Sequence, residues 1–115
     1  MLRGDIHLIN LDPVLGNEAN KQRPAVIVSN DRANAAAQRL HRGIVTVVPV
    51  TSNVSRLHPF QTLLPADRTG LPLDSKAQAE QMRSVSLERV GAALGHVPAD
   101  LLAELDEAIC IHLGL

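Results

Sequence analysis

The chain has 115 residues, of which 45% are hydrophobic and 20% charged, and its formal net charge is −1. This length fits a single domain, residues 1–115. The charge argues against nucleic-acid binding by an overall basic surface, and Phe60, the only aromatic among Phe, Trp and Tyr, cannot build a base-stacking platform. No apolar run approaches the roughly 18 residues of a membrane span, and Cys110 has no cysteine partner, so we expect a cytoplasmic protein without a membrane partner or intrachain disulfide.

The first half of the chain predicts three strands and one helix. The strands are expected over residues 4–11, 25–29 and 43–50, with a polar loop over 14–22 and a helix over 32–40. Asn30 or Asp31 can cap that helix, because both side chains accept hydrogen bonds from free amide groups at a helix start. Pro49, near the end of an otherwise β-branched strand, indicates a sheet edge or a bulge.

The second half contains one ambiguous segment. We expect a loop over 51–59, a strand over 60–64 and a turn-rich loop over 65–75. The segment 75–94 contains "KAQAEQMRSVSLERV", whose helix-forming residues favour a helix by local propensity alone.

The last segment predicts an amphipathic helix over 98–115. Its apolar face at helical spacing consists of Leu101, Leu102, Leu105, Ala108, Ile109 and Leu113. Pro98 and Asp100 suit the first turn, Gly114 suits the end, and Cys110 is expected toward the core or at a packing seam. Short strands followed by a terminal helix favour a mainly β fold, a small barrel with attached helices.

Motifs for cofactor chemistry are missing. The five histidines form no close pair at metal-ligand spacing, and no phosphate-binding glycine motif or nucleophile elbow occurs. The softer candidates are Arg23, where the polar loop meets a strand, and Thr51-Ser52-Asn53, just past a buried strand. A guanidinium and a hydroxyl together could bind a phosphate and stabilise transition-state charge without a metal. On spacing alone, Arg23 could instead pair with Glu18, and Thr51-Ser52 could only cap a turn.

Six stretches in order resemble the MazF/PemK (Kid) toxins of type II toxin–antitoxin systems. They are "RGDI", "LDPVLGNEANKQRPAVIVSND", "VVPVTSN", "DS" at Asp74-Ser75, "EQMRSVSLERV" and "LDEAICIHLGL". The second contains the G-x-E-x-x-x-x-R-P pattern of that family, and together the stretches cover nearly the whole chain.

The resemblance implies an SH3-like small barrel of the CcdB/PemK type that forms a homodimer. It implies a metal-independent, sequence-specific endoribonuclease that needs no cofactor and cuts single-stranded RNA. In that reaction the 2′-hydroxyl of the RNA attacks the phosphorus, leaving a 2′,3′-cyclic phosphate and a 5′-hydroxyl, which inhibits translation and growth. A small acidic MazE-like antitoxin is the expected protein partner.

The resemblance also implies site residues. Arg23 falls on the catalytic arginine of the family, which stabilises transition-state charge and has proton transfer as a second role open to it. Thr51 falls on the catalytic hydroxyl, which orients the phosphate. The implied RNA-binding residues are Asn17, Glu18, Asn20, Lys21, Gln22, Ser52, Asn53, Glu80 and Gln81. Arg83 follows Glu80 and Gln81 in the same family motif, but the role expected for it is structural and not RNA binding. Against propensity, the family pattern makes 74–83 a strand followed by a short helix.

Two positions depart from some relatives. Asn17 stands where they carry a histidine, and Gln78 stands where they carry an arginine, so neither supplies a general acid or base here. Two other functions stay open at this point: a non-catalytic SH3-like binding module, and a gyrase poison of the CcdB type. The second needs a Trp-Gly-Ile ending, whereas this chain ends in Leu-Gly-Leu and has no tryptophan.

Overall fold

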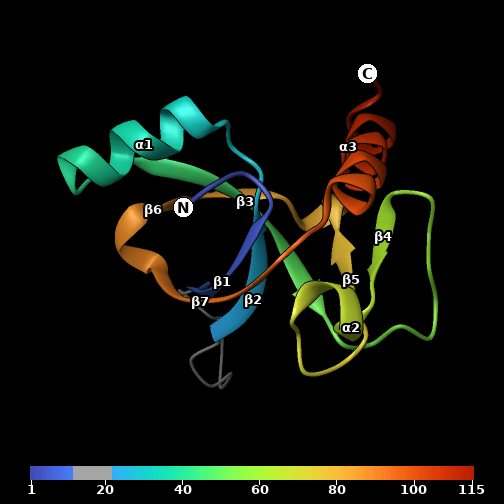
Figure 1. Cartoon of the computed structure of the whole chain (residues 1–115). Coiled ribbons are helices and arrows are strands. Elements are labelled where there is room, and N and C mark those ends of the chain that lie inside the picture. Colours follow the sequence, from blue (N-terminus) through green and yellow to red (C-terminus); the bar gives the residue numbers. More distant parts are fainter. Residues whose placement is uncertain (12–21) are drawn as a thin grey trace, which may run out of the picture.

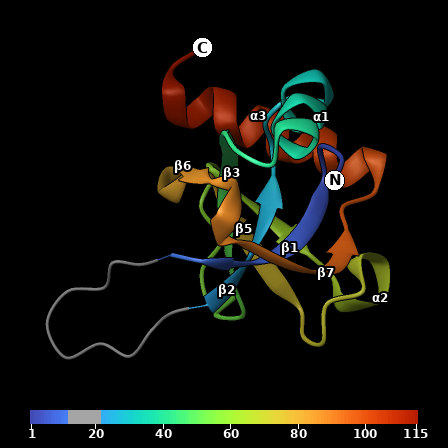
Figure 2. The ribbon, with the colours of Figure 1, turned by 90° about the vertical axis from the view of Figure 1, so that its left-hand side faces the viewer.

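The computed structural model describes residues 1–11 and 22–115. The strands in this part are β1 (Asp5–Asn10), β2 (Gln22–Ile27), β3 (Ile44–Thr51), β4 (Gln61–Leu64), β5 (Ser75–Gln78), β6 (Arg83–Ser86) and β7 (Val90–His96). The helices are α1 (Asp31–Leu40), α2 (Ala66–Thr69) and α3 (Ala99–Leu113), with 3-10 turns η1 (Ala79–Gln81) and η2 (Leu87–Arg89). Figures 1 and 2 show α1 and α3 at one end of the strands and α2 at the other.

All strand pairs in the described ranges are antiparallel. The sheet runs in the order β4-β5-β3-β2-β1-β7, and β6 pairs with β3 beside that path. The expected mainly β architecture with a C-terminal helix is therefore confirmed.

β3 is the centre of the sheet and forks along one edge. Its first half, Ile44–Val47, pairs with β6, and its end, Val50 and Thr51, pairs with β5. Pro49 lies between these two ladders. The N–H of Val28 donates to the carbonyl of Thr46, which makes Val28 and Thr46 a hydrogen-bonded pair between β2 and β3. Because such pairs alternate along an antiparallel ladder, Ala25↔Pro49 is a non-hydrogen-bonded pair. The nitrogen of Pro49 therefore points away from β2, toward the gap between β5 and β6. On that side no described strand pairs with Pro49, so locally it has the edge-like position that the sequence predicts, and its missing N–H costs no ladder hydrogen bond.

β2 begins at Gln22, three residues before the start of the strand predicted over 25–29, and it ends at Ile27, two residues before the predicted end. Gln22, Arg23 and Pro24 all pair with β1. On the other side, the β2–β3 ladder stops at Ala25↔Pro49. Pro24 occupies the next hydrogen-bonding position and has no N–H to offer Val50, so it is the chemical reason for that stop.

The ambiguous segment 75–94 contains no α-helix, so the helix favoured by propensity does not form. β5, β6 and β7 take up most of it, and the strand expected over 74–83 is interrupted by η1. The N–H of Met82 closes that turn on the carbonyl of Ala79, 3.1 Å away. The short helix expected directly after residue 83 does not form there: β6 occupies that place, and the 3-10 turn η2 comes only after β6.

The two longer helices begin and end where their sequences indicate. The Asn30 side chain accepts from the N–H of Ala33 (2.8 Å) and caps α1, and Gly114 ends α3 in the left-handed conformation. On α3, Leu101, Leu105 and Ala108 are buried. Of the two expectations for Cys110, a position toward the core is wrong, since the residue is exposed on α3. The turn-rich loop predicted over 65–75 contains α2, a single helical turn.

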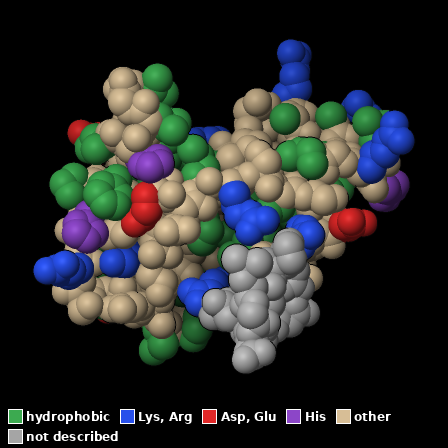
Figure 3. All heavy atoms as spheres, turned by 180° about the vertical axis from the view of Figure 1, so that it is seen from behind, with side chains coloured by type: hydrophobic (Ala, Val, Ile, Leu, Met, Phe, Trp, Pro, Cys, Tyr) green, Lys and Arg blue, Asp and Glu red, His purple; other side chains and the backbone are tan. Residues whose placement is uncertain are grey.

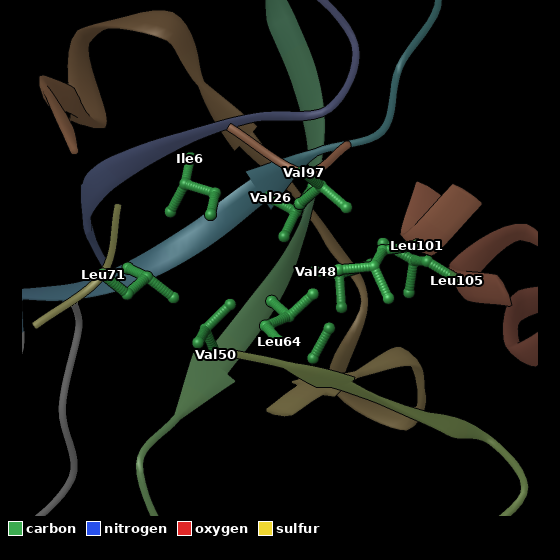
Figure 4. Packing of buried hydrophobic residues seen from close by; sticks show 10 residues of the cluster. Ile6, Val26, Val48, Val50, Leu64, Leu71, Val97, Leu101 and Leu105 are labelled. Atoms are coloured by element: carbon green, nitrogen blue, oxygen red, sulfur yellow. The ribbon is translucent and has the colours of Figure 1, made fainter. Parts of the chain in front are cut away.

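The core that supports the site lies between β1–β5 and α3. Figure 4 shows its side chains converging from the strands and from α3. Its buried members are Ile6, Val26, Val48, Val50, Leu64, Leu71, Ala77, Val97, Leu101 and Leu105. Among the described residues, no helix is both long and apolar enough to cross a membrane.

Candidate active site

Arg23 and Thr51 lie beside each other, although 27 residues separate them in the chain. Continuing the β2–β3 register two residues past Ala25↔Pro49 sets Arg23 opposite Thr51. Both side chains are half-buried and line the same cavity. The two residues on which the sequence argument places catalysis thus line one cavity, just past the end of the β2–β3 ladder.

The first cavity opens where Pro24 ends the ladder. Its volume is about 250 Å³, and its lining consists of Arg23, Pro24, Val50, Thr51, Ser52, Leu71, Pro72, Leu73 and Ser75. Val50 and Leu71 also belong to the core in Figure 4, so the apolar floor of the cavity is continuous with the interior. The guanidinium and the hydroxyls are the polar groups on this apolar surface.

Arg23 has no hydrogen-bonding or ionic partner among the described residues, whereas two other arginines are paired with aspartates. Arg3 pairs with Asp106, and Arg68 makes a two-pronged pair with Asp100. Near Arg23, Arg83 donates to the carbonyl of Leu11 (3.3 Å), which is not a charge partner. Figure 3 shows basic side chains gathered near the middle of one face. An unneutralised guanidinium at the mouth of a cavity suits an anion such as phosphate.

The Thr51 hydroxyl is oriented by the turn that follows it. Its oxygen accepts from the N–H of Asn53 (3.2 Å), so the turn-capping reading from the sequence is correct. That bond uses a lone pair and leaves the O–H free to donate into the cavity. Capping the turn and donating to a phosphate oxygen are therefore compatible roles for one side chain.

A second cavity of about 320 Å³ adjoins Arg23 at the fork in β3. It is lined by Leu11, Arg23, Pro49, Gln78, Gln81 and Arg83. Extending the β3–β6 register two residues past Val47↔Arg83 sets Gln81 beside Pro49, in the gap between β5 and β6. Arg23 is the residue common to both cavities.

The other predicted site residues are distributed unevenly. Ser52 lines the first cavity, whereas Gln22 and Asn53 are exposed next to lining residues in the chain, and the Asn53 side chain accepts from the hydroxyl of Ser55 (2.8 Å). Gln81 lines the second cavity. Asn17, Glu18, Asn20 and Lys21 lie outside the described residues.

Glu80 turns away from both cavities. Its Oε2 accepts from the amide of Gln61 on β4 (2.6 Å), and its Oε1 is buried without a partner among the described residues. Its neighbour Gln81, in contrast, lines the second cavity. The geometry pairs Glu80 with the β4 side of the fold, and its assignment to RNA stays a prediction.

Sequence reasoning missed part of the lining. In the sequence, Gln78 stood out only as a departure from relatives and had no expected binding role, although it lines the second cavity. Residues 71–73, which form the apolar wall of the first cavity, lay in a segment predicted as a loop. The signal that could have found the wall is "GLPL", an apolar run with no place on an amphipathic element.

The loop after Thr51 is tied down from β5. Lys76 pairs with Thr51 across the β3–β5 ladder and is only 7% exposed. Its Nζ donates to the carbonyl of Arg56 (2.6 Å), in the middle of the loop that begins with Ser52. A charge-assisted hydrogen bond from a buried amine thus holds the segment that carries Ser52 and Asn53.

Comparison with known families decides the affiliation. The model of the PemK-like, MazF-like toxin of type II toxin–antitoxin systems matches residues 2–113. The chain belongs to the PemK/MazF toxin family.

Members of the PemK/MazF family are similar to this chain in both sequence and structure. Endoribonuclease MazF9 of Mycobacterium tuberculosis (strain ATCC 25618 / H37Rv) is 60% identical over 115 residues, covering 100% of this chain and 98% of the relative. The MazE–MazF structure (Form-II) from Deinococcus radiodurans has a TM-score of 0.78 at 29% identity, covering 100% of this chain and 96% of that one. An endoribonuclease in complex with its cognate antitoxin from a mycobacterial species has a TM-score of 0.74 at 26% identity, with coverages of 100% and 96%.

Proposed function

We propose that this PemK/MazF family member is an endoribonuclease toxin that cuts single-stranded RNA at a short sequence without a metal. The observation that carries the proposal is that one cavity is lined both by Arg23, which has no charge partner among the described residues, and by Thr51, whose O–H is free to donate. A relative that is 60% identical along the whole chain and is named an endoribonuclease supports the same activity.

The reaction proceeds by attack of the RNA's own 2′-oxygen on the adjacent phosphorus. The 2′-hydroxyl gives up its proton as the new P–O bond forms, the P–O5′ bond breaks, and the leaving 5′-oxygen takes up a proton. The products are a 2′,3′-cyclic phosphate and a 5′-hydroxyl, and water is not consumed. Because the nucleophile belongs to the substrate, the protein only has to position the phosphate and stabilise its charge.

Arg23 and Thr51 divide that work. The planar guanidinium contacts two oxygens of the phosphate and offsets the charge that grows on them in the transition state. The Thr51 hydroxyl, fixed through Asn53, donates to one of these oxygens and orients the group. Ser52, Asn53, Gln22 and Gln81 would contact the neighbouring nucleotides, together with Asn17, Glu18, Asn20, Lys21 and Glu80 as the resemblance implies.

The proposal extends to fold type, partners and location. We assign the single domain to the SH3-like small barrels of the CcdB/PemK type and its action to the cytoplasm, where its RNA substrate is. An acidic MazE-like antitoxin is the proposed inhibitor, and the second cavity with Arg23 and Arg83 offers it positive charge without carboxylate partners among the described residues. A second copy of the chain completes a homodimer.

The test is cleavage of a long single-stranded RNA in EDTA, with chemical mapping of the fragment ends. The wild type should produce discrete cuts that carry cyclic-phosphate ends. Arg23→Ala should lower the cutting rate by about 10²–10³-fold, the usual effect of removing one preorganised donor to transition-state charge. Arg32→Ala is the matched control, since Arg32 is an exposed arginine on α1, outside both cavities.

Other outcomes would point elsewhere. Equal cutting by Arg23→Ala and wild type would end the catalytic assignment of Arg23. RNA that stays intact but bound would favour the non-catalytic binding module, and inhibition of DNA supercoiling without RNA cutting would favour a gyrase poison.

A further inference from the structure

We propose that the second cavity binds the nucleotide next to the scissile phosphate, that Gln78 and Gln81 select its base, and that Arg83 holds its outer phosphate. This inference rests on the proposed function and adds a specificity site to it. Neither Gln78 nor Arg83 has a binding role in the function as proposed so far.

The geometry that supports the proposal is the position of Arg23 between the two cavities. A phosphate on Arg23 has the first cavity, with Thr51, on one side and the second, with Gln78, on the other. Volumes of about 250 and 320 Å³ lie at or below the lower end of pockets for drug-sized ligands, roughly 300–1,000 Å³. Each cavity therefore suits one base or one sugar-phosphate unit, and consecutive nucleotides of a strand would occupy both.

The two linings differ in chemistry. The first cavity is walled mainly by Pro24, Val50 and residues 71–73, which offer apolar contact without directional hydrogen bonds. The second presents two glutamine amides, and neither makes a side-chain hydrogen bond with a described residue. Each amide has a donor and an acceptor, the combination that pairs with the edge of an unstacked base. Base selection should therefore be concentrated in the second cavity.

Arg83 lies at the same cavity, and one of its nitrogens is already occupied. Its Nη1 donates to the carbonyl of Leu11, which holds the exposed guanidinium at the cavity mouth. The remaining N–H groups are free of carboxylates among the described residues. A guanidinium held in this way is suited to a phosphate oxygen, a contact that positions RNA without reading its sequence.

The base-selection test uses Gln78→Met, Gln81→Met and the double variant, which keep side-chain length and remove the amide. Each protein cuts a pool of RNA with randomised positions, and end mapping gives the base frequencies around the cuts. The wild type should prefer certain bases at the position next to the scissile phosphate, and loss of an amide should reduce that preference about tenfold, as expected for one lost base-edge contact. Gln38→Met, on the exposed face of α1, is the matched control and should leave the frequencies unchanged.

The phosphate assignment is tested separately with Arg83→Met. Binding to fully 2′-O-methylated RNA, which cannot be cut, is measured over a range of salt concentrations. The variant should weaken binding equally for all sequences and reduce the slope of log affinity against log salt by about 0.7, the value for one phosphate contact on a single strand. Arg32→Met should leave the slope unchanged.

The outcomes separate this inference from the proposed function. A wild type that does not cut RNA overturns both. A wild type that cuts in an Arg23-dependent way, together with folded glutamine variants whose base frequencies match the wild type, overturns base selection alone. A change of base frequencies in Arg83→Met, in place of a uniform loss of binding, overturns the phosphate contact. Circular dichroism spectra that match the wild type establish that each variant is folded.

Discussion

Arg23 is held half-buried at a position that offers it no charge partner among the described residues. Burying part of a guanidinium without a carboxylate costs free energy, which arginines usually avoid by pairing, as Arg3 does with Asp106. Pro24 contributes to this arrangement, because by ending the β2–β3 ladder it leaves space beside Arg23. Arg23 thus supplies the positive charge, and Pro24, by ending the ladder, leaves the cavity beside it.

At the same scale, the Thr51 hydroxyl should affect turnover more than binding. Thr51→Val keeps the shape of the side chain but removes the O–H that donates to the phosphate, so kcat should fall by about 10²-fold with little change in KM. Thr51→Ser, which retains the hydroxyl, should recover most of the rate. Steady-state kinetics on a short fluorogenic RNA measures both constants. A purely structural Thr51 would instead give equal losses in the two variants or a change confined to KM.

The residues of the site differ in how far sequence could reveal them. Arg23 and Thr51 were singled out by the family resemblance, since their positions beside strand ends left a bland alternative open for each; that they line one cavity depends on the pairing of β2 with β3. Gln78 was not, because its place in the site depends on the fork in β3, which no local pattern announces. Glu80 shows the converse: a motif position identified in sequence faces Gln61 and away from the cavities.

At the scale of elements, long-range pairing outweighs local preference. Residues 75–94 contain strong helix formers, yet their backbone groups complete ladders with β3, β4 and β1, which pair with β5, β6 and β7. Helix propensities differ by less than about 1 kcal/mol per residue, so a few ladder bonds and buried valines reverse them. α1 and α3 were predictable because capping residues and apolar spacing agree with the tertiary contacts, whereas the early start of β2 depends on pairing with β1.

The pairing of Asp5 on β1 with His96 on β7 should make the free energy of unfolding depend on pH in the acidic range. Burial raises the pKa of Asp5, but the N–H of Leu2 and the neighbouring His96 outweigh it, and the pKa falls below 3.8. A lowered carboxyl pKa stabilises the fold above the unfolded-state pKa and loses that effect as pH falls through the folded-state value. The Tm of Asp5→Asn should therefore be lower than that of the wild type at pH 7, and the gap should close below about pH 4.

Thermal unfolding followed by circular dichroism between pH 7 and pH 2.5 measures this gap. Asp67→Asn is a suitable control, because Asp67 is exposed on α2 and makes no side-chain hydrogen bond with a described residue. A gap for Asp5→Asn that stays constant over the whole range would contradict the assignment.

For the whole molecule, the outer end of α3 presents exposed apolar side chains that a second copy could cover. Ile111 and Leu113 are each 50% exposed there, and Leu115 is 87% exposed. His112 on the same turn lies 6.4 Å from the ring of Phe60, which joins this end of the helix to the neighbouring loop and its exposed Leu57. Figure 1 shows the C-terminal end of α3 projecting from the fold. An apolar surface of this kind is what the proposed homodimer requires.

Leu113→Asp should therefore separate the two copies. A charge on this surface would be buried without a partner in the dimer, so the variant should sediment as a monomer at concentrations where the wild type sediments as a dimer. Leu40→Asp is the matched control, since Leu40 is a leucine of α1 that is 60% exposed. A dimeric Leu113→Asp protein would locate the contact between copies elsewhere.

The sharing of Val50 and Leu71 between the core and the first cavity limits how this toxin can diversify. Trimming Leu71 to alanine to admit a bulkier base would also hollow the interior, at a typical cost of about 2–5 kcal/mol. The second cavity carries no such penalty, because Gln78, Gln81 and Arg83 are not core residues. Proteins descended from this chain should therefore acquire new target sequences mainly through substitutions at Gln78, Gln81 and Arg83. The apolar wall beside Thr51 should accept substitutions more slowly.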